Sequence, residues 1–111
     1  MALVNFVHDG GVVDYTPAAD VAAGAIVVQG ELVGVAKLAI AANKLGSLAV
    51  AGVFDFPKAT GVGTAISAGA NCYWNAAAQQ ATTTATGNKL IGKCVRAAVD
   101  ADTTVRIRML Q

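Results

Sequence analysis

Strict alternation of apolar with other side chains is the pattern that most restricts what this chain can fold into. Near the C-terminus, Val105, Ile107 and Met109 are each separated by a single charged residue. A second alternating segment covers residues 47–56 and places on one predicted face Leu48, Val50, Phe54 and Phe56. A period of two is characteristic of antiparallel strands with one buried face. The sequence therefore predicts an all-β fold, a small antiparallel β-barrel or sandwich.

Glycines mark a turn near the N-terminus. Asp9-Gly10-Gly11 lies between the apolar segments Leu3–Val7 and Val12–Tyr15, which predicts a β-hairpin. The stretch Thr16–Asp20 contains a proline and is expected to form a loop. We therefore divide the chain into an extended N-terminal hairpin or arm, residues 1–20, and a single β domain, residues 21–111.

Two parts of the chain resemble each other. Ala23-Gly24-Ala25 is repeated as Ala68-Gly69-Ala70, and Leu32-Val33-Gly34 is repeated as Leu90-Ile91-Gly92. Ser47–Val50 is matched with Thr104–Ile107 in the second part, which also carries the polar insertion Asn75–Asn88. Such repetition predicts a barrel or sandwich built from a pseudo-duplicated unit. The insertion is expected to be a loop or an edge hairpin.

The segment Glu31–Leu45 is compatible with two secondary structures. On a helix, a shared face would contain Val35, Leu38, Ala42 and Leu45. Gly34 argues against the helix, because glycine in a helix interior costs about 1 kcal/mol. On a strand, a shared face would contain Leu32, Ala36, Leu38 and Ile40. The internal repeat favours the strand.

A modest core is expected, because the apolar residues are themselves small. Hydrophobic residues make up 55% of the 111 residues, many of them alanine, and aromatic residues make up 5%. Alanine contributes little transfer free energy on burial, whereas aromatic side chains usually contribute most. The charge-free segment 45–54 would also favour aggregation if it formed an open edge. We therefore expect one domain that buries further surface in a homo-oligomer or on a larger partner.

Charge and hydropathy exclude two classes of partner. The formal net charge is +1 and the basic residues are scattered along the sequence, so no nucleic-acid partner is predicted. Charged residues and glycines interrupt the most apolar stretch, 21–53, so no membrane-spanning helix is predicted. The N-terminus lacks the pattern of a secretory signal, so synthesis in the cytoplasm is expected. Cys72 and Cys94 would then be reduced thiols.

Motifs that suggest catalysis are incomplete. Gly87–Cys94 matches the phosphate-binding pattern G-x-x-x-x-G-K, but Cys94 replaces the Ser or Thr that would bind Mg²⁺. Leu90 and Ile91 fit a buried strand better. The single histidine, His8, and the two cysteines lack partners at the spacing that catalysis or zinc binding requires. The sequence therefore predicts no catalytic residues, no cofactor and no metal site, and hence no enzyme.

Short motifs along the chain resemble one known family. They are Asp14-Tyr15-Thr16, Leu32–Ala36, Gly52–Ala59, Tyr73-Trp74 and Asp102–Arg108. Together they are similar to the small capsid cement, or head decoration, proteins of tailed phages, a family sometimes labelled recombinase-like. The resemblance implies an all-β structural protein that forms homotrimers, binds the major capsid protein and stabilises the assembled head without catalysis. It also implies a location on the outer capsid surface of the virion, after synthesis in the host cytoplasm.

The candidates for an interface are Leu3, Val4, Phe6, Val7, Tyr73 and Trp74. The N-terminal residues would otherwise be exposed apolar side chains, although an intramolecular edge strand would also bury them. Tyr73 and Trp74 would point to opposite faces of a strand, so one of them is expected in the core. Two other functions stay open: a nucleotide-dependent recombination accessory protein, and a small carbohydrate- or peptide-binding β module.

Overall fold

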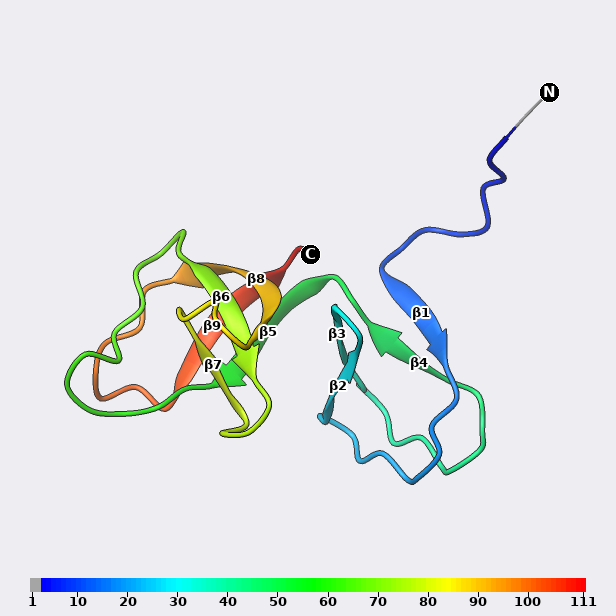
Figure 1. Ribbon diagram of the computed structural model, residues 1–111, viewed down its shortest axis with the longest axis horizontal. Coiled ribbons are helices and arrows are strands. Elements are labelled where there is room, and N and C mark those ends of the chain that lie inside the picture. The colour runs from blue at the N-terminus through cyan, green and yellow to red at the C-terminus, as the bar shows by residue number, and fades with distance from the viewer. Residues whose placement is uncertain (1–2) are drawn as a thin grey trace.

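The computed structural model describes residues 3–111, which contain two antiparallel sheets and no helix (Figure 1). The first sheet has the order β1-β4-β3-β2. Its strands are β1 (Val12–Tyr15), β2 (Ile26–Gln29), β3 (Leu32–Val35) and β4 (Gly46–Ala49). The predicted all-β fold is therefore confirmed, and the strand interpretation of residues 32–35 is correct.

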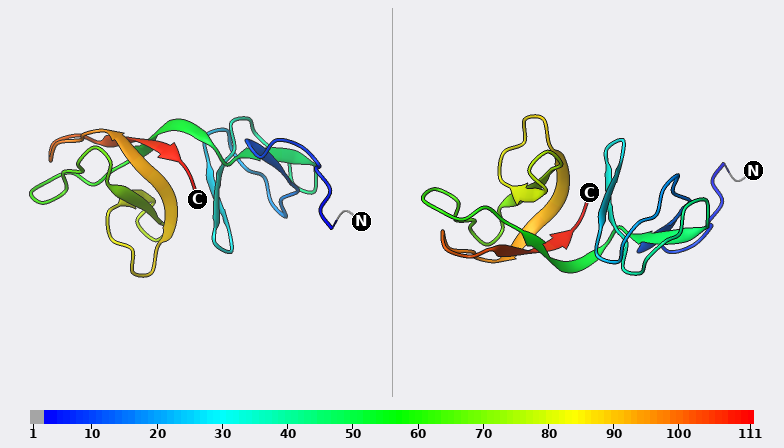
Figure 2. Two further views of the ribbon diagram at one scale, coloured as in Figure 1. Left: turned by 90° about the horizontal axis from the view of Figure 1, so that it is seen from above. Right: turned by 90° about the horizontal axis from the view of Figure 1, so that it is seen from below.

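The second sheet has the order β5-β9-β8-β6-β7. Its strands are β5 (Gly52–Pro57), β6 (Asn71–Asn75), β7 (Gln80–Thr82), β8 (Lys89–Arg96) and β9 (Thr104–Met109). The two sheets lie side by side along the longest dimension of a molecule that measures 52 × 37 × 23 Å (Figures 1 and 2). The arrangement is sandwich-like. The second sheet curls until β7 reaches the chain after β5, where Lys58 and Ala81 form an isolated parallel bridge.

Matching hydrogen bonds confirm the internal repeat. The N–H of Gly24 donates to Ala36 O (2.6 Å), and the N–H of Gly69 donates to Cys94 O (2.7 Å). Both glycines have a positive φ, 85° and 88°, which residues with a Cβ rarely adopt. Each copy of the repeat also contains one isolated antiparallel bridge at the same place. It joins Val21 to Ile40 in the first copy and Ile66 to Ala98 in the second.

The repeat is longer than the sequence comparison suggested. Strands β1, β2, β3 and β4 correspond in pairing and order to β5, β6, β8 and β9, and β7 is extra. The repeat begins with two similar segments that the sequence comparison missed, Gly11–Tyr15 and Gly52–Phe56. The predicted match of Ser47 with Thr104 was wrong by two residues. Ser47 pairs with Asp14 as Arg106 pairs with Asp55, so Ser47 corresponds to Arg106.

The alternating segment 47–56 forms two strands and not one. The first of them, β4, ends at Ala49. The second, β5, belongs to the other sheet and begins at Gly52, whose φ is 117°. Leu48 therefore lies in the core of the first half of the molecule, which contains β1–β4. Phe56 instead lies in a separate, larger core, which is built mainly on the second half, β5–β9. The shared face predicted for these residues was wrong, because alternation alone does not reveal a crossing between sheets.

Two further local expectations were wrong. Leu3–Val7 forms no strand, and β1 pairs with β4 instead. One further bond extends that ladder, in which Gly11 O accepts the N–H of Val50 (3.0 Å). Residues 3–10 lie outside the sheet. Leu38, predicted on a buried strand face, is 79% exposed because β3 ends at Val35.

The buried side chains of residues 3–111 form two clusters. The larger one combines the second sheet with residues from one face of the first sheet, Val33, Val35 and Ala49. The smaller one lies on the opposite face of the first sheet and consists of Ala36, Ile40 and Leu48. The first half thus depends on the second half for much of its burial.

Lys58 is a buried cation next to the larger core, with 4% of its surface exposed. Its Nζ donates to Ala59 O (2.7 Å), Asp102 O (3.2 Å) and Thr64 Oγ1 (3.2 Å). These bonds replace the water that a buried ammonium loses, and they join the loop after β5 to the loop before β9.

Replacing Lys58 with methionine should destabilise the fold by about 1–3 kcal/mol, because oxygens that now accept from the ammonium would lose a partner in a buried place. Urea unfolding measures the effect. Lys93→Met, at an exposed position of β8, is the matched control and should change little. Equal or greater stability of Lys58→Met would show that desolvation of the ammonium outweighs its bonds.

Cys72 and Cys94 are both buried and free. Burial raises the pKa of the Cys72 thiol from 9.0 to about 11. At pH 8 we expect neither thiol to react with a water-soluble disulfide reagent in the folded protein, and both to react in urea. A native thiol that reacts at the rate of free cysteine would contradict this burial.

The same shift makes stability depend on pH. Between pH 9 and about 11, the Cys72 thiol ionises in the unfolded chain but stays protonated in the fold. The unfolded state then binds fewer protons, so stability should fall as the pH rises through this range. Urea midpoints at several pH values measure the fall, and it should be smaller in Cys72→Ala, which isolates the thiol from other groups that titrate there.

Candidate interaction surface

The N-terminal arm, defined as residues 3–11, is an extended apolar segment outside both sheets. Figures 1 and 2 show it leaving the first sheet at β1 and pointing away from the rest of the molecule. Its large apolar side chains are almost completely exposed: Leu3 90%, Val4 86%, Phe6 83% and Val7 82%. Exposed apolar surface that is continuous along a segment is typical of an interaction site. Their role at an interface stays a prediction.

The outer face of the second sheet gathers cations that are apart in the sequence. Adjacent positions on β8 and β9 pair Lys93 with Arg108, and Arg96 with Arg106. All are exposed, and Asp55 on β5 lies opposite Arg106. The interpretation of the basic residues as scattered was therefore incomplete, because strand pairing brings half of the Lys and Arg residues onto one face.

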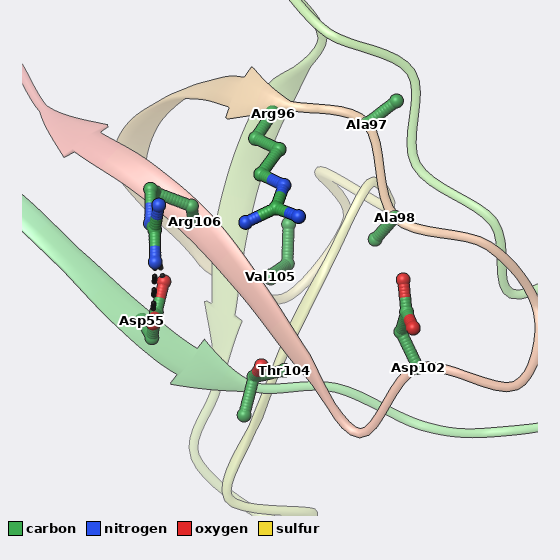
Figure 3. A pocket seen from close by; sticks show the side chains of 8 residues that line it. All are labelled: Asp55, Arg96, Ala97, Ala98, Asp102, Thr104, Val105 and Arg106. Carbon is green, nitrogen blue, oxygen red and sulfur yellow. Dashed lines mark hydrogen bonds and ion pairs between the residues drawn. The ribbon is translucent and has the colours of Figure 1, made fainter.

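Asp55 and Arg106 form the ion pair of this basic face (Figure 3). Arg106 Nε donates to Asp55 Oδ1 (2.9 Å), and the second guanidinium nitrogen donates to Asp55 Oδ2 (3.1 Å). The hydrogen bond from Arg106 lowers the pKa of the Asp55 carboxyl. Both side chains are over 40% exposed, so solvent screens the pair and it contributes little to stability.

A surface pocket of about 230 Å³ lies beside this ion pair and includes Arg96 and Asp102 in its lining. Figure 3 shows both side chains pointing into the hollow from different segments. Asp102 Oδ2 accepts the N–H of Val99 (2.9 Å), a local bond that fixes the turn before β9. The two carboxylates of the pocket, on Asp55 and Asp102, and the Arg106 guanidinium are thus used in structural bonds, and they form no nucleophile–base pair.

The aromatic candidates separate as expected. Trp74 is 3% exposed and packs on Phe56 with ring centroids 6.2 Å apart, so it belongs to the core. Tyr73 points to the other face of β6 and is partly exposed. Trp74 is therefore not available as an interface residue, whereas an interface role for Tyr73 stays a prediction. Phe56 is in the core as predicted, and Phe54 is partly buried against it.

The segment that resembles a phosphate-binding loop is a strand. Lys89–Arg96 forms β8, in which Ile91 and Gly92 are buried between β6 and β9. Lys93 Nζ donates to Asn71 Oδ1 (2.7 Å) on the neighbouring strand. The backbone is extended, so its N–H groups bond to neighbouring strands and cannot converge on a phosphate.

Within residues 3–111, His, Cys, Asp and Glu side chains form no group of three that could hold a metal ion. The same residues include no helix long and apolar enough to cross a membrane.

A family model described as phage cement protein matches residues 7–109 of the 111-residue chain. No curated protein and no solved structure matches the chain.

Proposed function

The chain belongs to the phage cement protein family, and we propose that it binds the outer surface of the assembled head through the major capsid protein and stabilises the shell. The observation that carries the proposal is the family match, which spans nearly the whole chain. The role involves no catalysis, consistent with the structural bonds that occupy Asp55, Asp102 and Arg106 in the surface pocket. The protein would be made in the host cytoplasm and would act on the virion.

Two surfaces support a docking role. The arm presents Leu3, Val4, Phe6 and Val7 to solvent, and burying them would contribute about 25 cal/mol per Å² of apolar surface. The basic face of β8 and β9 would favour an acidic surface on the partner. We propose that both surfaces are covered on the particle, the basic face by an acidic surface of the capsid and the arm by apolar contacts with the capsid or with another copy of the chain.

We further propose that the protein acts as a homotrimer. The smaller core contains only three buried side chains in the described chain, Ala36, Ile40 and Leu48, and partly buried apolar residues surround it. An oligomer would cover this surface. A trimer would also present several copies of each docking surface to neighbouring shell subunits.

Antibody labelling of purified virions, imaged in negative stain, tests the location. Label over the head surface of intact particles supports the proposal. Label confined to tails, or absent from particles that contain the protein by mass spectrometry, contradicts an outer capsid location.

Deleting residues 1–9 should leave the fold intact and weaken binding to the head. The described residues of this segment lie outside both sheets, whereas β1, which begins at Val12, supplies Val13 and Tyr15 to the smaller core and must be kept. Circular dichroism checks the fold, and co-sedimentation with capsids that lack the protein measures binding. Unchanged binding would contradict a role for the arm.

A further inference from the structure

The second half of the molecule contains a strand that the first half lacks. β7 pairs antiparallel with β6 and reaches Lys58, after β5, through a parallel bridge at Ala81. It therefore fills the gap between β6 and β5 (Figure 1). β2 and β1 correspond to β6 and β5, but no strand of the described chain takes the place of β7 beside β2.

The missing strand changes the burial of equivalent side chains. In the second half, three core side chains are at most 4% exposed: Phe56, Ile66 and Cys72. The residues at the same places of the first half stay partly exposed: Tyr15, Val21 and Val27. The apolar surface of the first half is thus incompletely covered where β7 would lie.

The edge of β2 is open at this place. Within residues 3–111, β2 pairs with β3 alone, and its last residues, Val28 and Gln29, are exposed. Alternate residues of such an edge direct N–H and C=O groups away from the sheet. The edge can therefore accept one more strand.

The arm has the composition of that strand. Leu3–Val7 is apolar except for Asn5 and carries no charge. As a strand it would place Val4 and Phe6 on one face, and its five residues would span about 17 Å. Val4 and Phe6 could then cover Val27 and Tyr15.

The arm of the same chain cannot take this place. A strand that replaced β7 would be antiparallel to β2 and parallel to β1, as β7 is to β6 and β5. Parallel strands need a connection of about a dozen residues or more. Only residues 8–11 separate Val7 from the start of β1 at Val12, so the strand must come from another copy.

We propose that residues 3–7 of a second copy add to β2 as an antiparallel strand, in the place that β7 takes in the second half. The inference rests on the proposed oligomer and specifies how its copies are joined. Each copy gives its arm to one neighbour and receives an arm from another. Such a head-to-tail exchange closes into a ring when the rotation between neighbouring copies allows closure, and a trimer is one such ring.

Charge substitutions on the two faces of the arm test the inference. In Phe6→Asp the carboxylate would face the apolar surface around Val27, so the oligomer should dissociate to folded monomers in light scattering. Asn5→Asp, one residue away on the opposite face of the added strand and beside the exposed Val28, is the matched control and should leave the oligomer intact. An oligomer that persists in Phe6→Asp overturns the inference.

A disulfide test identifies the neighbour of the arm. Asn5, which faces away from the smaller core in the added strand, would lie on the same side as Val28, because Val27 points to the smaller core. Asn5→Cys with Val28→Cys should therefore link different copies on oxidation, in solution and on capsids. Asn5→Cys with Val62→Cys is the control, since Val62 is fully exposed in a loop of the second half.

The outcomes separate this inference from the proposed function. A ladder of linked copies in the Asn5→Cys, Val28→Cys protein supports it. A bond within one chain, a bond to the capsid protein, or an oligomer without any bond overturns the exchange and leaves the proposed trimer standing. A monomer both in solution and on the head overturns the trimer and the exchange together, but leaves the docking proposal intact.

Discussion

Replacing Gly92 with alanine is expected to destabilise the protein by more than about 3 kcal/mol, a large part of the 5–15 kcal/mol typical of a small domain. Gly92 is buried on β8, between Cys72 on β6 and Met109 on β9. A Cβ at this position would overlap the backbone oxygen of Arg108 and would lie 2.8 Å from the backbone nitrogen of Leu110. Backbone atoms of a paired strand cannot move away as a side chain can, so β8 and β9 would have to separate.

Urea unfolding followed by circular dichroism measures this effect, and the melting temperature should fall by more than about 10 °C. Gly11→Ala is the matched control, because a Cβ there would meet no atom within 4 Å. Gly34, the equivalent of Gly92 in the first half, gives an internal comparison. A Cβ there would lie 2.8 Å from Leu48 Cβ, which β4 holds in place, but it would meet no backbone oxygen, so Gly34→Ala should also destabilise the protein, by less than Gly92→Ala. A stability of Gly92→Ala equal to that of Gly11→Ala would contradict the close strand approach.

The features that the sequence predicted correctly are those that repeat or alternate. Val105, Ile107 and Met109 are at most 2% exposed, because a strand with one buried face needs an apolar residue at every second position. Gly24 and Gly69 were found as repeated glycines. Both have a positive φ, which glycine adopts more readily than residues with a Cβ. Direct consequences of backbone geometry are therefore visible in the sequence.

The features that the sequence did not predict depend on which strands become neighbours. The side chain of Gln111 bonds to both backbone groups of Val33, accepting from its N–H and donating to its C=O at 2.7 Å. The residues are 78 positions apart, and no local sequence pattern predicts such a contact. The basic face was not predicted for the same reason, because Lys93 and Arg108 become neighbours only through the pairing of β8 with β9.

The candidate surface was partly predictable for a related reason. Leu3, Val4, Phe6 and Val7 were expected at an interface because they are apolar and terminal, and the structure leaves them exposed. The choice between Tyr73 and Trp74 could not be made from the sequence, because either face of β6 could have been the buried one. Packing on Phe56 places Trp74 inside.

The protein should bind an assembled capsid lattice about 10²–10⁴-fold more tightly than unassembled major capsid protein. A subunit of 111 residues offers a small contact to any single partner, and interfaces that bury less than about 1,200 Å² are usually weak. An oligomer that contacts several neighbouring shell subunits makes its later contacts intramolecular, because the lattice holds the partners at a fixed spacing. The gain in affinity therefore requires the lattice and an oligomeric ligand.

Linkage then requires that the protein stabilises the shell. A ligand that binds the assembled lattice better than its free parts shifts the equilibrium toward the lattice, so the capsid melting temperature should rise as the protein is added. Co-sedimentation with mature capsids and with free capsid protein measures the two affinities, and calorimetry measures capsid melting. The variant lacking residues 1–9 is the control and should lose most of the preference if the arm joins the copies. Equal affinity for lattice and free subunit, or an unchanged melting temperature at saturation, would contradict a cement role, because a shell is reinforced only by a protein that distinguishes it from its parts.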